Sequence, residues 1–130
     1  MTRILLVDDD RDILDIIRLD LQDNPAFAVD ICTSSSEALD ISKKTGYDVI
    51  IADWRMPVMN GTELIRNLRS SGCRSYIILY SGCSIGADIR AALDFGADYY
   101  LHRGGDPDRE FAELHHVINQ AVPPGPAGQT

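Results

Sequence analysis

The sequence predicts a three-layer α/β fold in which a five-stranded parallel sheet carries helices on both faces. Short apolar runs alternate five times with amphipathic segments along the 130 residues, which is typical of parallel strands joined by crossover helices. Most of the runs are continuously apolar, as strands covered on both faces are. Glycine, proline, asparagine or serine stands between most segments and indicates turns there. Together these observations predict a doubly wound sheet with five helices.

Five apolar runs are too short to form helices of ordinary length and are expected to be strands. The first ends at the acids Asp8, Asp9 and Asp10, and the third ends at Asp53. The second alternates only weakly between apolar and polar residues, so we expect it nearer an edge of the sheet. In chain order the expected strands cover residues 4–7, 27–33, 48–53, 76–80 and 98–101.

Five other segments place apolar residues three or four positions apart and are expected to be amphipathic helices. Asp10 is positioned to cap the first helix, and the serines at 34–36 offer caps for the second. Gly46, Gly72 and Gly96 are expected to end the second, third and fourth helices, because glycine readily adopts the left-handed conformation found after helix ends. In chain order the expected helices cover residues 11–23, 34–45, 61–71, 87–95 and about 108–122.

The last two helices carry predictions for individual side chains. The fourth helix is expected to turn Ile89, Ala92 and Leu93 toward the core. His115 and His116 lie on the last helix and are expected to be solvated, with no part in binding a metal.

A single domain is expected over residues 1–122, since 130 residues suffice for one hydrophobic core. Residues 123–130 are rich in proline and glycine and have no apolar pattern, which predicts a disordered tail or a linker in a longer parent protein. Met1, Thr2 and Arg3 lead directly into the first strand, so no signal peptide is expected.

Composition excludes several classes of function. A net charge of -8 argues against direct binding of nucleic acid, which requires a basic surface. No apolar stretch approaches the roughly 20 residues that a membrane-spanning helix needs. Cys32, Cys73 and Cys83 are too few and too scattered for a disulfide framework or a zinc site. We therefore expect free thiols in a cytoplasmic protein.

Chemically distinctive side chains follow four of the expected strands: Asp8 and Asp9, Asp53, Ser81, and Arg103. In doubly wound sheets ligands bind outside the carboxyl ends of the strands, so these side chains are expected to share one site. Three carboxylates together suit Mg²⁺, and a carboxylate can also act as a nucleophile that forms an acyl phosphate. A hydroxyl and a cation beside them would suit the oxygens of a phosphoryl group.

Each of these acids by itself has a simpler interpretation as a turn former or a helix cap, and we assign Asp10 only the cap. The functional interpretation of Asp8, Asp9 and Asp53 depends on their expected proximity. Trp54 is expected to be a packing or surface residue without a chemical role.

Four stretches together resemble the receiver domains of the response-regulator family, and the resemblance covers residues 3–122. These stretches are Ile4–Asp10, Asp53–Pro57 with Asn60 and Gly61, Tyr80–Gly82, and Gly96–Leu101. The resemblance implies the flavodoxin-like strand order 2-1-3-4-5. It also implies a phosphoacceptor signalling switch of a two-component system, which assists its own phosphorylation and dephosphorylation but is not an enzyme of metabolism.

The resemblance implies a role for each matching residue. Asp53 corresponds to the phosphoacceptor, while Asp8, Asp9, Asp53 and the backbone carbonyl of Arg55 correspond to the Mg²⁺ ligands. Ser81 corresponds to the hydroxyl residue that turns toward the phosphoryl group. Tyr100 corresponds to the aromatic switch residue, and Tyr99 is expected only to pack.

The resemblance also implies partners. A sensor histidine kinase or a phosphotransfer domain would donate the phosphoryl group. The signal would pass to a downstream effector or to other domains of a longer parent protein, and the face formed by the fourth helix, fifth strand and fifth helix could form a homodimer. No direct contact with nucleic acid or membrane is expected.

The chain departs from the family after the fifth strand, where receivers normally have Lys-Pro. The lysine position falls on Arg103 and the proline position on Gly104. Arginine keeps the charge but is larger and planar, and glycine removes the stiffness of proline. His102 is the other candidate for the lysine position, but strand alternation places it on the opposite face from Arg103.

Two other functions remain as alternatives. The loss of Lys-Pro favours a receiver that acts through constitutive contacts and scarcely uses phosphate, whereas the intact acids disfavour it. An aspartate-nucleophile phosphatase that uses Asp8 and Asp10 is disfavoured by Asp12, which stands where that superfamily has threonine or valine.

Overall fold

The computed structural model describes residues 1–82 and 86–122, which form a five-stranded parallel sheet. Its strand order is β2-β1-β3-β4-β5, which confirms the expected fold and places β2 at one edge. The strands are β1 Thr2–Val7, β2 Phe27–Cys32, β3 Val49–Ala52, β4 Tyr76–Ser81 and β5 Tyr99–His102.

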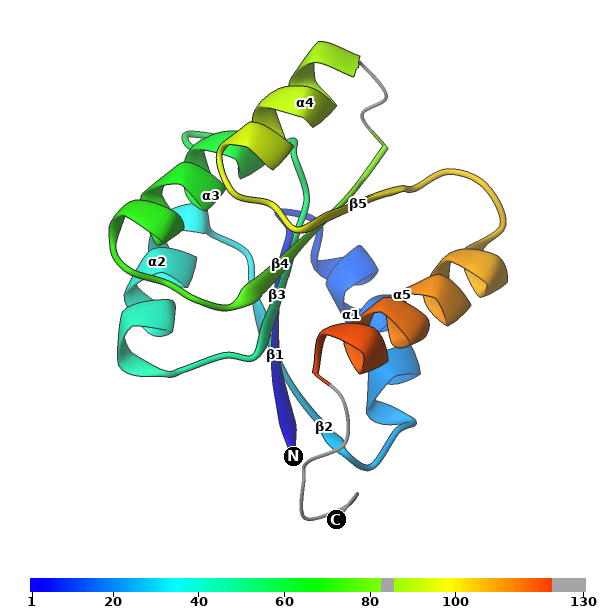
Figure 1. Ribbon diagram of the computed structural model, residues 1–130. Coiled ribbons are helices and arrows are strands. Elements are labelled where there is room, and N and C mark those ends of the chain that lie inside the picture. Colours follow the sequence, from blue (N-terminus) through cyan, green and yellow to red (C-terminus); the bar gives the residue numbers. More distant parts are fainter. Residues whose placement is uncertain (83–85, 123–130) are drawn as a thin grey trace.

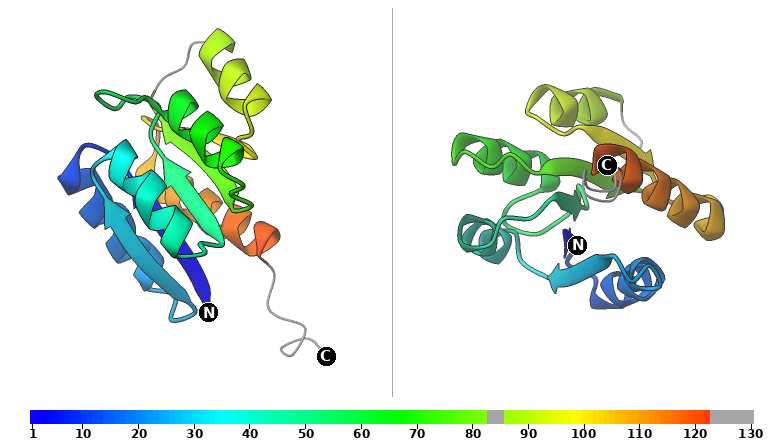
Figure 2. Two further views of the ribbon diagram at one scale, coloured as in Figure 1. Left: turned by 90° about the vertical axis from the view of Figure 1, so that its left-hand side faces the viewer. Right: turned by 60° about the horizontal axis from the view of Figure 1, so that its bottom comes forward.

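The helices form a layer on each face of this sheet. Helices α1 and α5 cover one face, and α2, α3 and α4 cover the other (Figures 1 and 2). Their bounds are α1 Arg11–Gln22, α2 Ser35–Lys44, α3 Gly61–Ser70, α4 Gly86–Asp94 and α5 Pro107–Ala121. In the part of the chain that the structure describes, no helix combines the length and the apolarity required to cross a membrane.

The alternation of side chains along each strand divides the core into two layers. In β1, Ile4 and Leu6 pack with α1 and α5, whereas Leu5 and Val7 pack with α2 and α3. All four are almost fully buried, which explains why the run is continuously apolar.

Most of the expected caps are present. The Asp10 carboxylate accepts hydrogen bonds from the backbone N–H groups of Asp12 and Ile13. Gly72 and Gly96 adopt positive φ angles of 91° and 120° after α3 and α4, as expected.

The expectation for Gly46 was wrong, because α2 ends one residue earlier in a different way. Thr45 closes the helix with a backbone hydrogen bond to Ile41 and is itself extended, with φ -120° and ψ 125°. The chain therefore leaves α2 directly in an extended conformation, and no left-handed residue is needed.

Two predictions for buried and exposed side chains were also wrong. Leu93 is 44% exposed while Ala92 is buried, because adjacent helical residues point about 100° apart and α4 turns only one of them inward. His115 is half-buried: its ring stacks on Phe27 at 5.7 Å, and its Nε2 lies 2.9 Å from Asp20 Oδ2. His115 on α5 thus contacts the start of β2 through Phe27 and α1 through Asp20.

Other predictions were confirmed. His116 is exposed, and Tyr99 packs against the core with its hydroxyl donating to Glu113. Trp54 is half-buried, and its indole N–H donates to Thr62 Oγ1 at 2.8 Å. Cys32 and Cys73 are free thiols. The predictions for Cys83, for the Ile89 side chain and for residues 123–130 lie outside the described residues.

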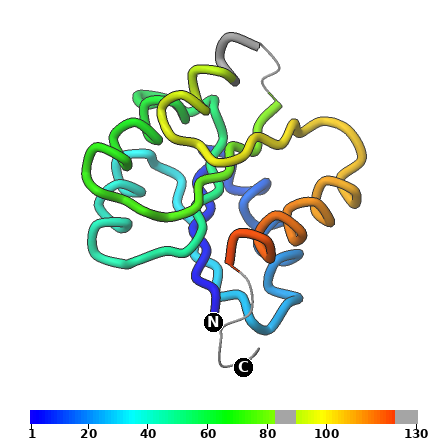
Figure 3. Tube along the Cα trace, viewed as in Figure 1, coloured from blue at the N-terminus to red at the C-terminus, as the bar shows by residue number. Residues whose placement is uncertain are grey.

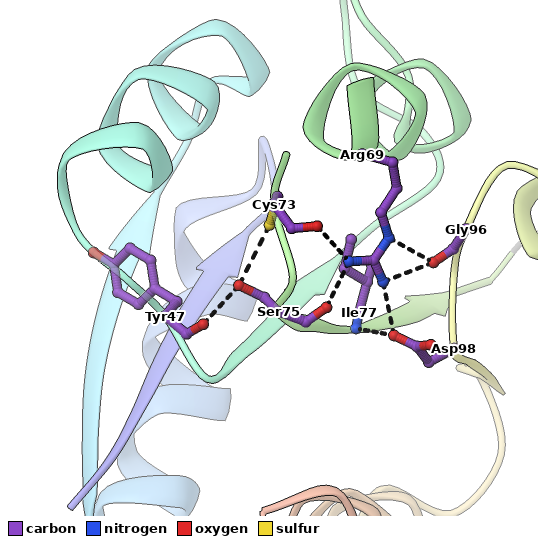
Figure 4. Close-up of polar contacts among 7 residues, drawn as sticks. All are labelled: Tyr47, Arg69, Cys73, Ser75, Ile77, Gly96 and Asp98. Atoms are coloured by element: carbon purple, nitrogen blue, oxygen red, sulfur yellow. Dashed lines mark hydrogen bonds and ion pairs between the residues drawn. The ribbon is translucent and has the colours of Figure 1, made fainter. Parts of the chain in front are cut away.

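The amino ends of β4 and β5 are joined by one arginine from the end of α3 (Figure 4). Arg69 donates from Nε and Nη2 to the Gly96 carbonyl and from Nη1 to the carbonyls of Cys73 and Ser75. Its Nη2 also lies 2.8 Å from Asp98 Oδ2. Every Arg69 nitrogen thus has an acceptor.

Two further hydrogen bonds extend this network. Asp98 accepts from the backbone N–H of Ile77 in β4, and the Ser75 hydroxyl donates to the Tyr47 carbonyl just before β3. The amino edge of β3, β4 and β5 is therefore tied together by polar contacts.

Candidate functional site

The two buried acids lie at the carboxyl ends of neighbouring strands. Asp8 directly follows β1 and Asp53 directly follows β3, and these strands pair in the sheet. The backbone N–H of Asp53 donates to Val7 at 3.1 Å, so the sheet continues to the acid itself. The Asp8 N–H likewise donates to Cys32, at 3.2 Å. Sheet pairing therefore positions both carboxylates side by side.

Three acids come together at this point. One carboxylate oxygen from each of Asp8, Asp9 and Asp53 lies within 4.8 Å of the others. Asp8 and Asp53 are only 3% and 6% exposed, while Asp9 faces solvent. Asp10 is absent from the cluster in the described residues because its carboxylate caps α1. The geometry thus disfavours a phosphatase that depends on Asp8 and Asp10.

The cluster suits a hard divalent cation. Two of its carboxylates are buried and the third is open to solvent, which leaves room for the water ligands that Mg²⁺ retains. Within the described part of the chain, Asp53 Oδ1 is buried and has no hydrogen-bond partner. A buried carboxylate oxygen without a partner is costly, so a ligand at this oxygen would remove a cost that the fold otherwise bears.

The proximity of the acids affects the protonation of Asp8. The pKa of Asp8 is raised from 3.8 to about 6: burial is the largest cause, the backbone N–H of Asp10 acts against it, and the negative charge of Asp53 adds to it. Arg103 lowers the pKa of Asp8 but does not cancel the burial. A cation beside Asp8 would favour its charged form.

Arg103 spans the two buried acids, as expected from its position. Its Nη1 donates to Asp8 Oδ2 at 3.1 Å, and its Nη2 lies 3.4 Å from Asp53 Oδ2. Burial lowers the pKa of Arg103, but Asp53 and Asp8 more than offset this, so the pKa is raised. His102 is exposed instead, with Nδ1 3.2 Å from the Tyr100 hydroxyl. The structure therefore brings Arg103, and not His102, to the acids.

Ser81 is buried at the end of β4 and links the site to β5. Its backbone carbonyl accepts the Arg103 N–H at 2.8 Å, and the Tyr100 hydroxyl lies 3.4 Å from the same carbonyl. Tyr100 is half-buried and packs with the core layer of α2, α3 and α4. The Ser81 carbonyl is thus a shared contact of the Arg103 backbone and the Tyr100 hydroxyl; the switching roles of Ser81 and Tyr100 remain predictions.

The loop after β3 approaches the site closely. A Cβ atom on Gly61 would lie 2.5 Å from the Asp53 carbonyl oxygen, so only glycine fits there. Asn60 and Glu63 form a reciprocal capping box that starts α3 at this glycine. Arg55 lies exposed in the same loop, and the role of its carbonyl as a metal ligand remains a prediction.

One buried residue near the site, Glu110, was not found from the sequence. Glu110 is 7% exposed, and its carboxylate accepts hydrogen bonds from the Tyr80 hydroxyl and from the backbone N–H groups of Gly104 and Gly105. The signal was the spacing: Glu110 precedes the buried Leu114 by four residues and so falls on the inward stripe of α5.

Sequence comparison identifies matching proteins for most of the chain. Residues 4–115 match the family described as the response regulator receiver domain. The cell cycle response regulator CtrA of Brucella ovis is 33% identical over 119 residues, which are 92% of this chain and 51% of that protein. The chain thus spans about half the length of the curated relatives it matches.

Solved structures show the same fold. A response regulator receiver domain protein from Clostridium thermocellum is 27% identical, with a TM-score of 0.83 over 94% of each chain. The receiver domain of the sensor histidine kinase PA1611 from Pseudomonas aeruginosa is 24% identical, with a TM-score of 0.80 over 93% of this chain and 97% of that one. The latter structure has a magnesium ion coordinated in the active site cleft.

Proposed function

Because the chain belongs to the response regulator receiver domain family, we propose that it takes a phosphoryl group from a histidine kinase onto Asp53, with Mg²⁺ bound beside it. A receiver domain is a two-component signalling switch and not a classical enzyme. The observation that carries the proposal is Asp53 Oδ1, which is buried among acids and has no partner within the described residues.

The acidic triad supports the choice of metal. Asp8, Asp9, Asp53 and the carbonyl of Arg55 would hold Mg²⁺, as the resemblance implies and as hard oxygen ligands favour. The magnesium ion in the related Pseudomonas receiver domain adds support. When bound, the ion supplies positive charge that neutralises the carboxylates and the phosphoryl oxygens.

The side chains around Asp53 account for the transfer. An Asp53 oxygen attacks phosphorus as the P–N bond to the donor histidine breaks, which leaves an acyl phosphate on Asp53 and returns the electron pair to the imidazole. The Arg103 guanidinium already lies beside the accepting carboxylate and would follow the new negative charge. Ser81 would donate its hydroxyl to a phosphoryl oxygen.

The readout follows from the same contacts. Because Arg103 and Tyr100 both contact the Ser81 carbonyl, a shift at the end of β4 would reach β5. Tyr100 would report that shift on the face formed by α4, β5 and α5, through which the domain would contact an effector, a second copy, or other parts of a longer parent protein. The net charge of -8 disfavours direct contact with nucleic acid, and the free thiols Cys32 and Cys73 favour the cytoplasm.

Incubation with Mg²⁺ and phosphoramidate tests the proposal. The intact protein should gain the mass of one phosphoryl group, and Asp53→Asn should gain none. Asp12→Asn is the matched control, since Asp12 is an acid of the first turn of α1 outside the cluster. A wild-type protein that gains no mass, or an Asp53→Asn variant that gains as much, overturns the proposal.

A receiver that works by constitutive contacts is the second candidate. Arg103 already bridges Asp8 and Asp53 with positive charge, and the stiff proline of the family is replaced by Gly104. This candidate predicts no phosphorylation by phosphoramidate and no response to beryllofluoride, so the same experiment separates the two.

A further inference from the structure

We propose that Glu110 is a positioning residue for the phosphotransfer reaction, which acts by clamping the loop that carries Arg103. The inference rests on the proposed function and adds a component that the resemblance does not imply. We call the group formed by Glu110, Tyr80, Gly104 and Gly105 the loop clamp.

The loop clamp is built on one buried carboxylate. Glu110 Oε1 accepts the Tyr80 hydroxyl at 2.6 Å, while Oε2 accepts the backbone N–H of Gly105 at 2.7 Å and that of Gly104 at 3.2 Å. A buried carboxylate is retained only when its oxygens are satisfied, and hydrogen bonds to a charged acceptor are stronger than neutral ones. Glu110 therefore joins α5, the core strand β4 and the loop after β5.

The two groups that Glu110 binds, the loop backbone and the Tyr80 hydroxyl, both belong to residues next to Arg103. Gly104 is the next residue in the chain, so its bond to Glu110 fixes the backbone that carries the guanidinium. The Arg103 guanidinium also lies over the Tyr80 ring, with Cζ 5.4 Å from the ring centre. Glu110 thus holds the backbone behind Arg103 and the aromatic ring beneath it.

The loop has a flexible sequence, because two of its residues are glycines. Gly104 has φ of 128°, a conformation that proline cannot adopt and that other residues rarely do. A groove of about 250 Å³ between α1 and α5 runs along the loop, lined by Ile13, Phe111 and the loop glycines themselves. In the trace the chain arches away from β5 before α5 begins (Figure 3). A carboxylate that binds two backbone N–H groups gives this Arg-Gly-Gly segment a restraint of the kind that a proline ring supplies covalently.

The loop clamp would affect the reaction by keeping the positive charge of Arg103 beside Asp53. Arg103 can stabilise the transferring phosphoryl group only if its guanidinium is already beside Asp53, because reorganising it during the reaction adds to the barrier. Release of the loop would let Arg103 leave Asp8 and Asp53 for solvent. Small misplacements of such groups reduce rates by an order of magnitude or more.

Glu110→Gln tests the inference, because the amide keeps the shape but loses the negative charge that strengthens the bonds to the loop, and it has one acceptor oxygen where the carboxylate has two. Its rate of phosphorylation by phosphoramidate in Mg²⁺ should fall about tenfold, and Tyr80→Phe should show a smaller decrease. The fluorescence of Trp54, the only tryptophan and the neighbour of Asp53, can follow the reaction. Thermal unfolding of each variant shows that it is folded.

Glu113→Gln is the matched control. Glu113 lies one turn along α5 and also accepts from a tyrosine, but that tyrosine is Tyr99 in β5 and not a residue of the loop clamp. Its rate should equal that of the wild type. In an Arg103→Ala background, Glu110→Gln should cause no further decrease, because a residue that acts through Arg103 has nothing left to position.

Several outcomes would overturn the inference. It fails if Glu110→Gln reacts as fast as Glu113→Gln, or if Glu110→Gln lowers the rate equally with and without Arg103. If Glu110→Gln does not fold, an unchanged rate in Tyr80→Phe overturns it. A wild-type protein that gains no phosphoryl group overturns the proposed function and this inference together, whereas a phosphorylated wild type with an unaffected Glu110→Gln variant overturns this inference alone.

Discussion

The two edges of the sheet each have an arginine that joins neighbouring strands, and the two arginines are used differently. At the amino edge, Arg69 contacts three backbone carbonyls and Asp98, and each of its nitrogens has an acceptor (Figure 4). At the carboxyl edge, Arg103 faces Asp8 and Asp53, and Asp53 Oδ1 still has no partner among the described residues.

The difference indicates that the amino edge of the sheet serves stability and the carboxyl edge serves function. The amino edge is satisfied, so a change at Arg69 removes favourable contacts and leaves partly buried carbonyls without this donor. The carboxyl edge has more negative than positive charge, since three acids gather around one guanidinium. Binding of a cation, or protonation of one carboxylate, would reduce the repulsion among these acids. A phosphoacceptor that depends on a metal requires such an excess of negative charge.

The largest expected effect is at the amino edge. Arg69→Ala should lower the free energy of unfolding by on the order of 3 kcal/mol, because it leaves the carbonyls of Cys73, Ser75 and Gly96 without their donor. Denaturant unfolding measures this. Arg66→Ala, an exposed position one turn earlier in α3 that stacks on Phe95, should cost less than about 1 kcal/mol. Equal costs at the two positions would refute the role given to Arg69.

A smaller effect of opposite sign is expected at the carboxyl edge. Without Mg²⁺ at pH 7.5, Asp8→Asn should raise the free energy of unfolding by about 1 kcal/mol, because it removes a buried charge beside Asp53. Adding Mg²⁺ should stabilise the wild type and not the variant.

The pH dependence follows from the raised pKa of Asp8. The folded protein keeps the Asp8 proton up to about pH 6, whereas the unfolded chain loses it near 3.8. The folded state therefore binds more protons between these values, and the contribution of Asp8 to stability falls as pH rises from about 4 to 6. The advantage of Asp8→Asn should disappear near pH 4. Parallel pH curves for wild type and variant in metal-free buffer would contradict this assignment.

The smallest effect is expected for Arg103→Lys. This change should alter the free energy of unfolding by less than about 0.5 kcal/mol, because lysine keeps the positive charge and Arg103 neutralises the acids only in part. Arg69→Lys should cost about 2 kcal/mol, since an ammonium cannot reach all the acceptors that the planar guanidinium does. Thermal unfolding of the two variants side by side compares the edges directly, and similar losses of Tm would show that both arginines serve stability.

Local patterns explain why much of the fold and site could be predicted. The apolar runs placed each strand, and Asp8 and Asp53 were expected at strand ends because they directly follow such runs. Helix ends were less predictable: Gly72 and Gly96 adopt the expected conformation, but Gly46 does not. A glycine permits a left-handed turn without requiring one.

Contacts between distant parts of the chain explain what was missed. His115 was expected in solvent, yet its ring stacks on Phe27 at the start of β2 and its Nε2 lies beside Asp20 of α1. Leu93 was expected inside because its helix is amphipathic, but the orientation of α4 decides which of two adjacent residues faces inward.

The sequence by itself determined the order of strands and helices, the acids at the ends of β1 and β3, and the family resemblance, since these depend on periodicity and on residues close together in the chain. Only the tertiary structure decided that Glu110 meets Tyr80 and the loop glycines, that Arg69 satisfies the amino edge, and that Asp53 Oδ1 is buried without a partner in the described residues. The physical reason is that the burial and pairing of a polar group depend on what packs against it, and those partners come from other parts of the chain.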